Sequence, residues 1–271
     1  MTVPGLLLLG APKSGTTTLA AWWDQQPRGF TAPEKEVGFF TVEWERGLDW
    51  YRSRFAAAGP HHITCDASPG YMYEAEALDR IAHTLPDARL AVVLRNPVER
   101  AWSHWCYMVA LGLEPRDFEH VIDQESVDED VTPPDFPIGY LRGSNYLRCL
   151  TAISARFDRS QLLVLLTDEL RADPGSTFAR LCDDGGIPTG APGGLENAGR
   201  FPRSVALQRG LGRVGASRWG VGRRLMMANL RQGPPPQLSP ERRARLQALL
   251  HPDLPALEQW LGQPLPPSWS R

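Results

Sequence analysis

The chain has 271 residues, of which 42% are hydrophobic and 22% are charged, and its formal net charge is −2 at pH 7. This length and composition fit one α/β domain with a sizeable core. The slight acidic balance argues against a nucleic-acid-binding surface, because such surfaces carry a basic excess.

Apolar runs bounded by turn residues predict parallel strands at 5–9, 63–66, 90–94 and 162–166. Helical spacing between these runs predicts helices at 16–25, 75–85, 98–112, 145–157 and 176–182. Alternation of strand and helix predicts a parallel sheet covered by helices on both faces. Ligands of such sheets bind beyond the carboxyl ends of the strands, where the turns 10–15, 67–71 and 95–97 would lie.

Two stretches interrupt this alternation. Residues 117–137 are acidic, contain prolines and show little apolar periodicity, so we expect a solvated loop. Residues 207–236 are rich in glycine and arginine and end in three prolines, which favours an irregular lid or surface segment. Helical spacing resumes at 241–250 and 254–261, and no internal repeat is found.

The leucine run at residues 6–9 follows no positively charged segment and is much shorter than a signal peptide's apolar region or a membrane span. We therefore expect a cytoplasmic protein without a membrane span. The four cysteines include no C-x-x-C pair, so neither a zinc site nor a disulfide framework is expected.

The turn after the first predicted strand has the features of an anion site. Gly10 and Gly15 have the spacing of a nucleotide-binding P-loop, but no lysine follows Gly15, and Lys13 lies inside the loop instead. A glycine-bounded loop that leads into a helix offers backbone N–H donors and the positive end of the helix dipole. Ser14, Thr16 and Thr17 add hydroxyl donors, so phosphate binding is favoured over an ordinary turn.

A second strand-to-helix turn carries an arginine and a serine. Arg95 follows the predicted strand 90–94, Pro97 suits a first helical turn, and Ser103 lies two helical turns beyond Arg95. An arginine and a serine placed together can form a second anion site. Taken alone, an arginine before a helix is more often a surface residue.

Lysine is rare in the chain, since Lys13 and Lys35 are the only two lysines.

Together, the two turns resemble the signature elements of sulfotransferases that use 3'-phosphoadenosine 5'-phosphosulfate (PAPS). The sequence "PKSGTTTL" at 12–19 is similar to their 5'-phosphosulfate loop, and "LRNPVERAWSHW" at 94–105 is similar to their 3'-phosphate element. The donor in that family has no γ-phosphate. The resemblance therefore implies no Walker-type lysine and no metal, and it implies that a lysine inside the loop meets the bridging oxygen.

Further segments are similar to the heparan-type Golgi sulfotransferases and their soluble bacterial relatives. They are "EKEVGFF" at 34–40, "GLDWYRSRF" at 47–55, "DASPGYMY" at 66–73, "GSNYLRCLTAISARF" at 143–157 and the run at 165–181. The resemblance covers residues 4–190, and "ENAGRFPRS" at 196–204 resembles a late loop that closes over the donor. It implies one sulfotransferase domain over 1–271, with a core at 4–190 and a lid with C-terminal helices at 191–271.

The family's site residues are carried over position by position. The donor-binding residues that the resemblance implies are Lys13, Ser14, Gly15, Thr16, Thr17, Arg95, Ser103 and Arg203. It implies two catalytic residues, Glu36 as the base and Lys13 at the leaving group. One position departs from the pattern, because Ala67 stands where the heparan-type enzymes have a lysine before Ser68 and Pro69.

The identity of the base stays open between Glu36 and a histidine. A carboxylate within reach of the acceptor hydroxyl can take its proton as the bond to sulfur forms. Cytosolic sulfotransferases use a histidine, but His61 and His62 precede a predicted strand and His104 lies on a predicted helix. Most glutamates lie in water without a catalytic role, and the "KEVGFF" context is what favours Glu36.

These observations predict an enzyme that moves a sulfuryl group from PAPS to an acceptor hydroxyl and releases adenosine 3',5'-bisphosphate (PAP). We expect a small-molecule or carbohydrate acceptor, such as a secondary metabolite or a glycoconjugate precursor, no nucleic-acid partner, and either a monomer or a homodimer. One alternative is a P-loop nucleoside or small-molecule kinase, which is disfavoured because no lysine follows Gly15. The other alternative is a non-catalytic nucleotide-binding module.

Overall fold

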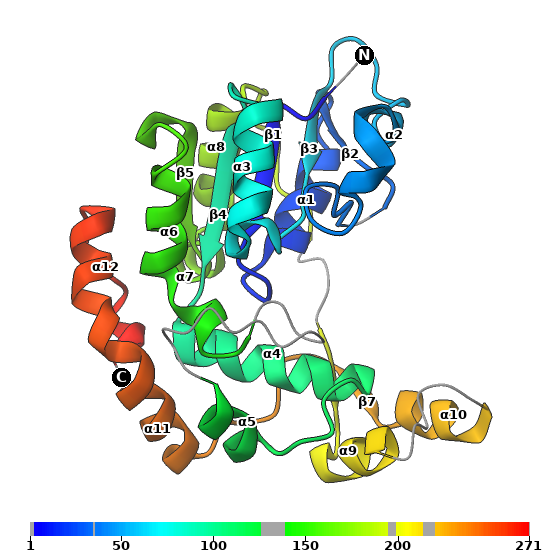
Figure 1. The fold of residues 1–271 in the computed structure, drawn as a ribbon, viewed down its shortest axis with the longest axis vertical. Coiled ribbons are helices and arrows are strands. Elements are labelled where there is room, and N and C mark those ends of the chain that lie inside the picture. The colour runs from blue at the N-terminus through cyan, green and yellow to red at the C-terminus, as the bar shows by residue number, and fades with distance from the viewer. Residues whose placement is uncertain (1–2, 35, 126–138, 195–198, 214–219, 271) are drawn as a thin grey trace. The chain divides into compact units, whose positions relative to one another are not determined.

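The computed structural model describes residues 3–34, 36–125, 139–194, 199–213 and 220–270. The chain forms two compact units (Figure 1). The first unit comprises residues 1–95 and 146–196, and the second comprises 96–145 and 197–271. Lys35 and most of the acidic segment, residues 126–138, lie outside the described residues.

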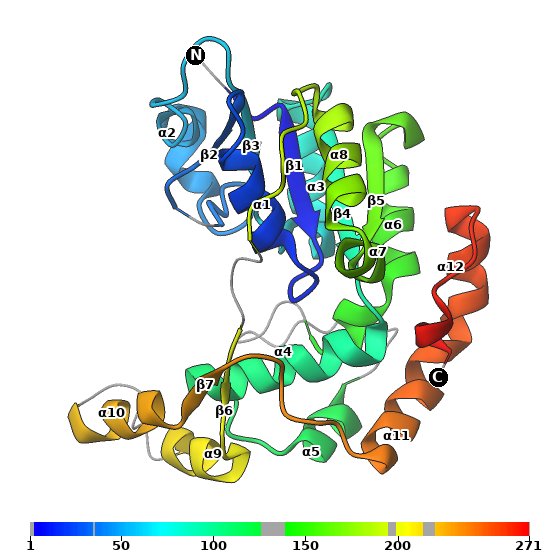
Figure 2. The ribbon, with the colours of Figure 1, turned by 180° about the vertical axis from the view of Figure 1, so that it is seen from behind.

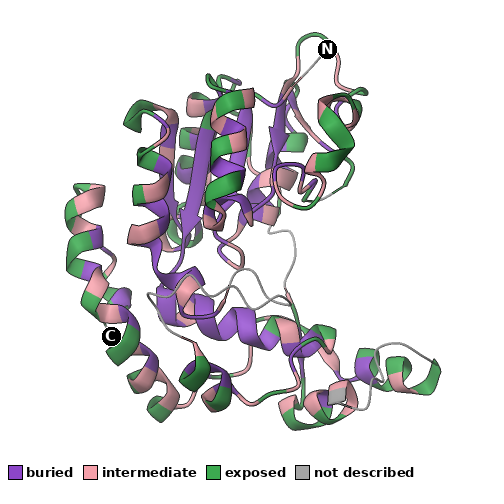
Figure 3. Ribbon diagram, in the orientation of Figure 1, coloured by how far each residue is buried: buried purple, intermediate pink, exposed green. Residues whose placement is uncertain are grey.

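A five-stranded parallel sheet forms the centre of the first unit, with strand order β2-β3-β1-β4-β5. Its strands are β1 (Leu6–Gly10), β2 (Gly29–Thr31), β3 (Ile63–Asp66), β4 (Arg89–Leu94) and β5 (Leu162–Leu166). β1 lies between β3 and β4, and its leucines are fully buried (Figure 3). Because the strands are parallel, the turns that follow them lie along one edge of the sheet.

Helices cover both faces of this sheet. They are α1 (Thr16–Asp24), α2 (Gly47–Ser53), α3 (Ala75–Thr84), α6 (Tyr146–Ser154), α7 (Thr167–Ala172) and α8 (Pro174–Gly185). Figures 1 and 2 show α3 and α6 on one face of the sheet and α1 and α8 on the other. Trp22 and Trp23 of α1 and Phe178 of α8 pack with Leu6 and Leu8 in one buried cluster. The predicted fold class, a parallel α/β sheet flanked by helices, is confirmed.

The second unit is mainly helical. Its elements are α4 (Pro97–Leu111), α5 (Phe118–Gln124), α9 (Val205–Arg213), α10 (Gly220–Ala228), α11 (Pro240–Leu250), α12 (Leu254–Leu261) and the antiparallel strands β6 (Arg200–Pro202) and β7 (Leu230–Gln232). α4 is buried along most of its length, and Trp102 and Trp105 pack with Phe118 of α5 and Leu246 of α11 (Figure 3). Among the described residues, no helix combines the length and apolar character that crossing a membrane requires.

The four predicted strands are present, and the predicted helices between them are present with ends shifted by a few residues. β2 was missed because it has only three residues and pairs with β3 alone. The short helices α2 and α7 were also missed. Short elements carry too few apolar positions for periodicity to identify them.

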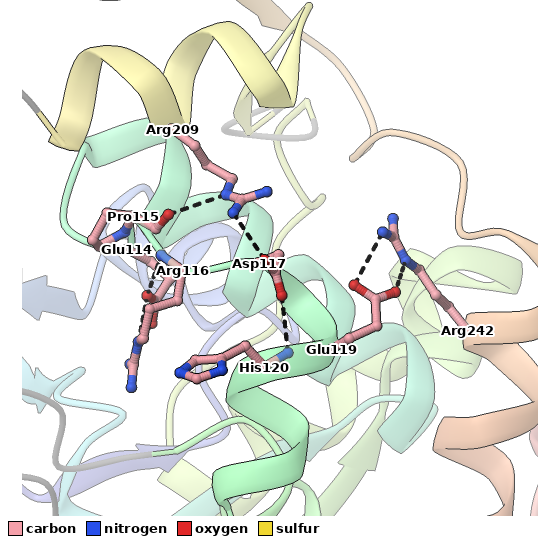
Figure 4. A network of polar contacts seen from close by, with 8 residues as sticks. All are labelled: Glu114, Pro115, Arg116, Asp117, Glu119, His120, Arg209 and Arg242. Atoms are coloured by element: carbon pink, nitrogen blue, oxygen red, sulfur yellow. Dashed lines mark hydrogen bonds and ion pairs between the residues drawn. The ribbon is translucent and has the colours of Figure 1, made fainter.

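The prediction of a loop over 117–137 is wrong at its start, where α5 forms. The Asp117 side chain accepts a hydrogen bond from the His120 backbone N–H and so caps the helix (Figure 4). Phe118, Val121 and Ile122 bury one face of α5. Arg209 of α9 donates to Asp117 at 3.3 Å. The cap hydrogen bond from His120, with a smaller contribution from Arg209, holds the pKa of Asp117 below its usual range.

A second arginine binds a carboxylate in the first turn of α5. Arg242 of α11 donates to Glu119 at 2.6 Å (Figure 4), and this hydrogen bond lowers the pKa of Glu119. Acidic residues of α5 thus contact arginines from two later helices. The sequence pattern could not show this, because the compensating charges lie about ninety to one hundred and twenty residues away.

The prediction of an irregular segment over 207–236 is also wrong for much of its length. α9 and α10 are regular helices, and β7 pairs with β6. Gln208 is fully buried and its side chain donates to the Ala110 carbonyl, while Asn229 donates to Gln208 at 2.8 Å. Tertiary hydrogen bonds therefore offset the weak helix propensity of the glycines in this segment.

We predict that Gly29→Ala strongly destabilises the first unit. An added Cβ would lie 1.8 Å from the backbone carbonyl oxygen of Trp23, which cannot move without displacing α1. Overpacking of this kind costs about 1–3 kcal/mol, and a backbone clash should fall at the upper end. Gly70→Ala is the matched control, because Gly70 has φ −76° and no atom within 4 Å of an added Cβ. Urea unfolding of both variants measures the difference, and equal midpoints would contradict the prediction.

Candidate active site

The loop after β1 is held at three points. The Ala11 N–H donates to the Val93 carbonyl at 2.9 Å, the Ser14 N–H donates to the Ala11 carbonyl at 3.2 Å, and the Thr167 hydroxyl donates to the Ser14 carbonyl at 2.8 Å. Lys13 has φ 72°, a left-handed conformation that is uncommon for a residue other than glycine. The loop is therefore tied to β4 and to the turn after β5.

The loop ends at the start of α1. Gly15 has φ 110° and is the N-cap residue, and it supplies no side-chain hydrogen bond to the first turn. The first backbone N–H groups of an α-helix have no partner inside the helix, so they can bind an anion. Thr16 and Thr17 begin α1, which places their N–H groups and hydroxyls at this end.

Ser14 supports the interpretation of the loop as a ligand site. Its side chain is 1% exposed, and within the part of the chain that the structure describes its Oγ has no hydrogen-bond partner. A buried hydroxyl without a partner is costly and rare in native proteins. A phosphate or sulfate oxygen in the loop would satisfy it, and the residues around it fit such a group.

Arg95 joins the loop to the end of β4. Its guanidinium donates from Nη1 to the Lys13 carbonyl oxygen at 3.1 Å, and its own carbonyl accepts from the Tyr146 hydroxyl at 2.8 Å. The side chain is only 8% exposed. The structure therefore brings together Lys13 and Arg95, which the sequence placed in two separate predicted anion sites.

Glu36 lies in an exposed turn that the first unit holds against the same edge of the sheet. It has φ 63°. Two residues later, the Gly38 N–H donates to the Ser68 hydroxyl just after β3 at 3.1 Å. The turn after β3 also packs on the end of β1, since a Cβ at Gly10 would lie 1.8 Å from Met72 Sδ. The segment after β3 therefore contacts both the segment that carries Glu36 and the end of β1, where the Lys13 loop begins.

Three other positions that the sequence singled out are Ser103, Arg203 and Ala67. Ser103 is 1% exposed on α4, and Arg203 is exposed after β6, with its N–H donating to the Asn229 carbonyl at 2.7 Å. Both belong to the second unit, so their grouping with Arg95 stays a prediction. Ala67 packs against the buried cluster of β1 and α1.

The other candidate bases differ from Glu36 in their surroundings. His62 precedes β3, at the amino end of the strand, and its Nδ1 accepts from the Gly59 N–H at 2.8 Å. His61 lies beside it, and His104 lies in the second unit on α4. Asp66 is fully buried, and burial raises its pKa although three hydroxyl groups donate to it.

Sequence reasoning missed several supporting residues. Thr167 holds the loop through Ser14, and Tyr51 and Tyr71 donate to Asp66. Thr167 directly follows a predicted strand, so the rule that sites form at strand ends could have identified it. Tyr51 lies on α2, which carried no comparable signal. Among the described residues, no group of three His, Cys, Asp or Glu side chains is arranged to hold a metal ion.

Comparison with known proteins agrees with these features. A family profile described as the sulfotransferase family matches residues 50–190, which is more than half of the chain. The chain therefore belongs to the sulfotransferase family.

Curated relatives include the heparan sulfate glucosamine 3-O-sulfotransferase 6 of Homo sapiens, which is 30% identical over 180 residues. The bifunctional heparan sulfate N-deacetylase/N-sulfotransferase 1 of Caenorhabditis elegans is 26% identical over 189 residues. Each match covers 66% of this chain, but it spans only 51% of the human protein and 22% of the nematode protein.

Solved structures share the fold. A sulfotransferase from Alicyclobacillus acidocaldarius aligns over the whole of both chains with a TM-score of 0.75 and 22% identity. A mouse sulfotransferase complexed with PAP aligns with 96% of this chain and 88% of its own, with a TM-score of 0.53 and 13% identity.

We predict that Arg95→Ala weakens binding of PAP by about ten- to a hundredfold, because a charge-assisted contact to phosphate contributes about 1.5–3 kcal/mol. The change also removes the donor to the Lys13 carbonyl, so the loop itself loosens. Isothermal titration calorimetry measures the affinity. Arg89→Ala is the control, because Arg89 is exposed at the opposite end of β4 and donates to the Ser160 carbonyl. Equal affinities for the two variants would exclude Arg95 from the site.

Proposed function

We propose that this protein transfers a sulfuryl group from PAPS to an acceptor hydroxyl and releases PAP. The observation that carries the proposal is the buried Ser14 hydroxyl, which lacks a partner among the described residues in a loop that also presents Lys13 and the start of α1. This loop is built to hold a small, highly charged oxyanion, and no residue in it matches the lysine of a triphosphate-binding loop.

The residues of the loop have distinct roles in this proposal. The N–H groups at the start of α1 and the hydroxyls of Ser14, Thr16 and Thr17 hold the oxygens of the 5' group. The Lys13 ammonium neutralises charge that grows on the leaving phosphate as the bond to sulfur breaks. Arg95 holds the Lys13 carbonyl and contributes a fixed positive charge beside the loop. The resemblance also assigns Ser103 and Arg203 to donor binding, and these assignments stay predictions.

Glu36 acts as the general base. An acceptor hydroxyl is a weak nucleophile, and a carboxylate within hydrogen-bond reach can remove its proton as sulfur is attacked. The exposed position of Glu36 leaves room for an acceptor, and the bond from Gly38 to Ser68 keeps its turn at the sheet edge. Positioning and charge supply most of the catalysis, as in phosphoryl transfer through a loose, in-line transition state.

The acceptor belongs to the glycans or to the small natural products. The named curated relatives act on heparan sulfate, which favours a hydroxyl on a carbohydrate or a glycoconjugate precursor. We further propose that the protein is cytoplasmic and acts in secondary metabolism. The proposed reaction requires no metal ion. Cell fractionation tests the location, and a mass-spectrometric search for products heavier by one sulfuryl group tests the acceptor.

Ligand-induced stabilisation separates this function from a kinase. A ligand that binds only the folded state raises the unfolding temperature. PAP without Mg²⁺ should stabilise the protein, and Mg²⁺-ATP should have little effect. Stabilisation by Mg²⁺-ATP alone would favour a kinase. Release of sulfate from labelled PAPS distinguishes the enzyme from a non-catalytic nucleotide-binding module.

For Lys13→Ala, we expect kcat to fall much more than the donor KM rises, because the charge that Lys13 meets is larger in the transition state than in the ground state. Steady-state kinetics with varied PAPS measure both constants. A rise in KM at unchanged kcat would show that Lys13 only binds the donor.

For Glu36→Gln, we expect kcat to fall by about 10²–10⁴, the usual contribution of general base catalysis. The amide keeps the shape of the side chain but cannot accept the proton at neutral pH. Binding of PAP should be unchanged by calorimetry. If the variant keeps near-normal kcat with a full-sized acceptor, another residue is the base.

A further inference from the structure

The first unit contains a buried carboxylate that the proposed reaction does not use. Asp66 ends β3 and is 0% exposed. Three hydroxyl groups donate to it. Ser68 donates to Oδ1 at 2.6 Å, and Tyr51 and Tyr71 donate to Oδ2 at 2.8 and 2.9 Å. Burying a carboxylate is costly unless hydrogen bonds compensate it, and here three hydroxyl groups supply them.

Two of these hydroxyls also accept hydrogen bonds from the segment 36–40, which carries Glu36. The Gly38 N–H donates to the Ser68 hydroxyl at 3.1 Å, and the Phe40 N–H donates to the Tyr71 hydroxyl at 3.5 Å. The first contact is well formed, and the second is at the long limit of a hydrogen bond. Asp66 is thus connected to two backbone N–H groups of the segment through one hydroxyl each.

The direction of these bonds depends on the carboxylate. An ionised carboxylate can only accept, and a hydroxyl has a single proton to donate. While Asp66 is ionised, the hydroxyls of Ser68 and Tyr71 direct their protons toward it and offer their lone pairs to the backbone N–H groups. An amide at position 66 keeps one accepting oxygen and places a donating NH2 group where the other oxygen was. At least one of the two hydroxyls, that of Ser68 or that of Tyr71, would then face a donor and turn its proton toward a backbone N–H that is itself a donor.

The backbone of Glu36 requires such support. Its φ of 63° lies in the left-handed region, which costs free energy for a residue other than glycine. Such a conformation persists only where the surrounding structure holds it in place. The bonds at Gly38 and Phe40 begin two residues after Glu36 and attach this turn to β3.

We propose that Asp66 is a positioning residue for the Glu36 turn and acts through the hydroxyls of Ser68 and Tyr71. This inference rests on the proposed role of Glu36 as the base. In this proposal Asp66 determines the position of the Glu36 carboxylate and does not itself contact the sulfuryl donor or the acceptor. The hydroxyl of Tyr51 differs from the other two, because among the described residues it donates to Asp66 but accepts no N–H from the segment 36–40. Its ring stacks on Phe39 of that segment at 4.3 Å, a contact that a phenylalanine would keep.

The test compares Asp66→Asn and Ser68→Ala with Tyr51→Phe in the full chain. Tyr51→Phe is the matched control, since it removes one donor to Asp66 while it keeps the ring on Phe39. Hydrogen exchange of the Gly38 and Phe40 amides reports whether the segment is held. Calorimetry with PAP and steady-state kinetics report donor binding and kcat.

We expect Asp66→Asn to accelerate exchange of at least one of the two amides and to lower kcat by about tenfold or more, the usual scale for a misplaced catalytic group. Ser68→Ala should accelerate exchange at Gly38. PAP affinity should stay within about twofold, because the loop after β1 is held by other contacts. Tyr51→Phe should leave the exchange rates of the two amides near the original values. In a Glu36→Gln background, Asp66→Asn should cause no further loss.

Unchanged exchange and kcat in Asp66→Asn would overturn the proposal. A loss of kcat without faster exchange, or a full additional loss in the Glu36→Gln background, would also overturn it, because Asp66 would then act independently of the turn. If Asp66→Asn fails to fold, Ser68→Ala and Tyr71→Phe test the same connection. Normal kcat in Glu36→Gln would refute the proposed base, whereas the exchange measurements would still decide whether Asp66 holds the turn.

Discussion

The hydrogen bond from Arg95 to the Lys13 carbonyl joins the carboxyl ends of the two central strands, β1 and β4. The geometry of the candidate site depends on this hydrogen bond. Lys13 adopts a left-handed backbone conformation, which costs free energy and would relax if the loop were not held in place. The bond places a positive guanidinium against the backbone of the loop. A loop held in this way does not need to reorganise when an anion arrives, which reduces the cost of binding.

A second constraint comes from the hydroxyl groups around the sheet edge. Thr167 supports the loop after β1, and Ser68 supports the turn of Glu36. Each hydroxyl comes from a residue just beyond the end of a strand, so the sheet sets the separation of the supports. A parallel sheet is rigid because it is buried on both faces, and catalytic groups attached to its edge inherit that rigidity.

In the second unit, charge compensation has a different role. α5 lies in a stretch of acidic sequence, yet Arg209 and Arg242 bind its carboxylates from helices far along the chain. These pairs are partly exposed, so each contributes modestly to stability. The apolar face of α5, with Phe118 against Trp102 and Trp105, supplies the packing.

The amino-acid sequence alone determined the parallel α/β class and the four longer strands of the sheet, and it predicts phosphate binding at the loop of Lys13. These features depend on local patterns, which are apolar runs, glycine spacing and residue types next to each other in the chain. The resemblance to sulfotransferases also followed from short motifs, and the family is confirmed. The roles of the individual site residues stay predictions, and Ser103 and Arg203 belong to a separate unit from Lys13 and Arg95.

Only the tertiary structure decided how the site is supported. The bonds of Arg95 to Lys13, of Thr167 to Ser14 and of Ser68 to Gly38 join residues 30 to 153 positions apart. The helices α5, α9 and α10 likewise form in segments whose composition indicates loops, because distant arginines, buried amides and apolar faces stabilise them. Hydrogen bonds and packing between distant residues depend on which segments the tertiary fold brings together. A local pattern of residue types does not contain that information.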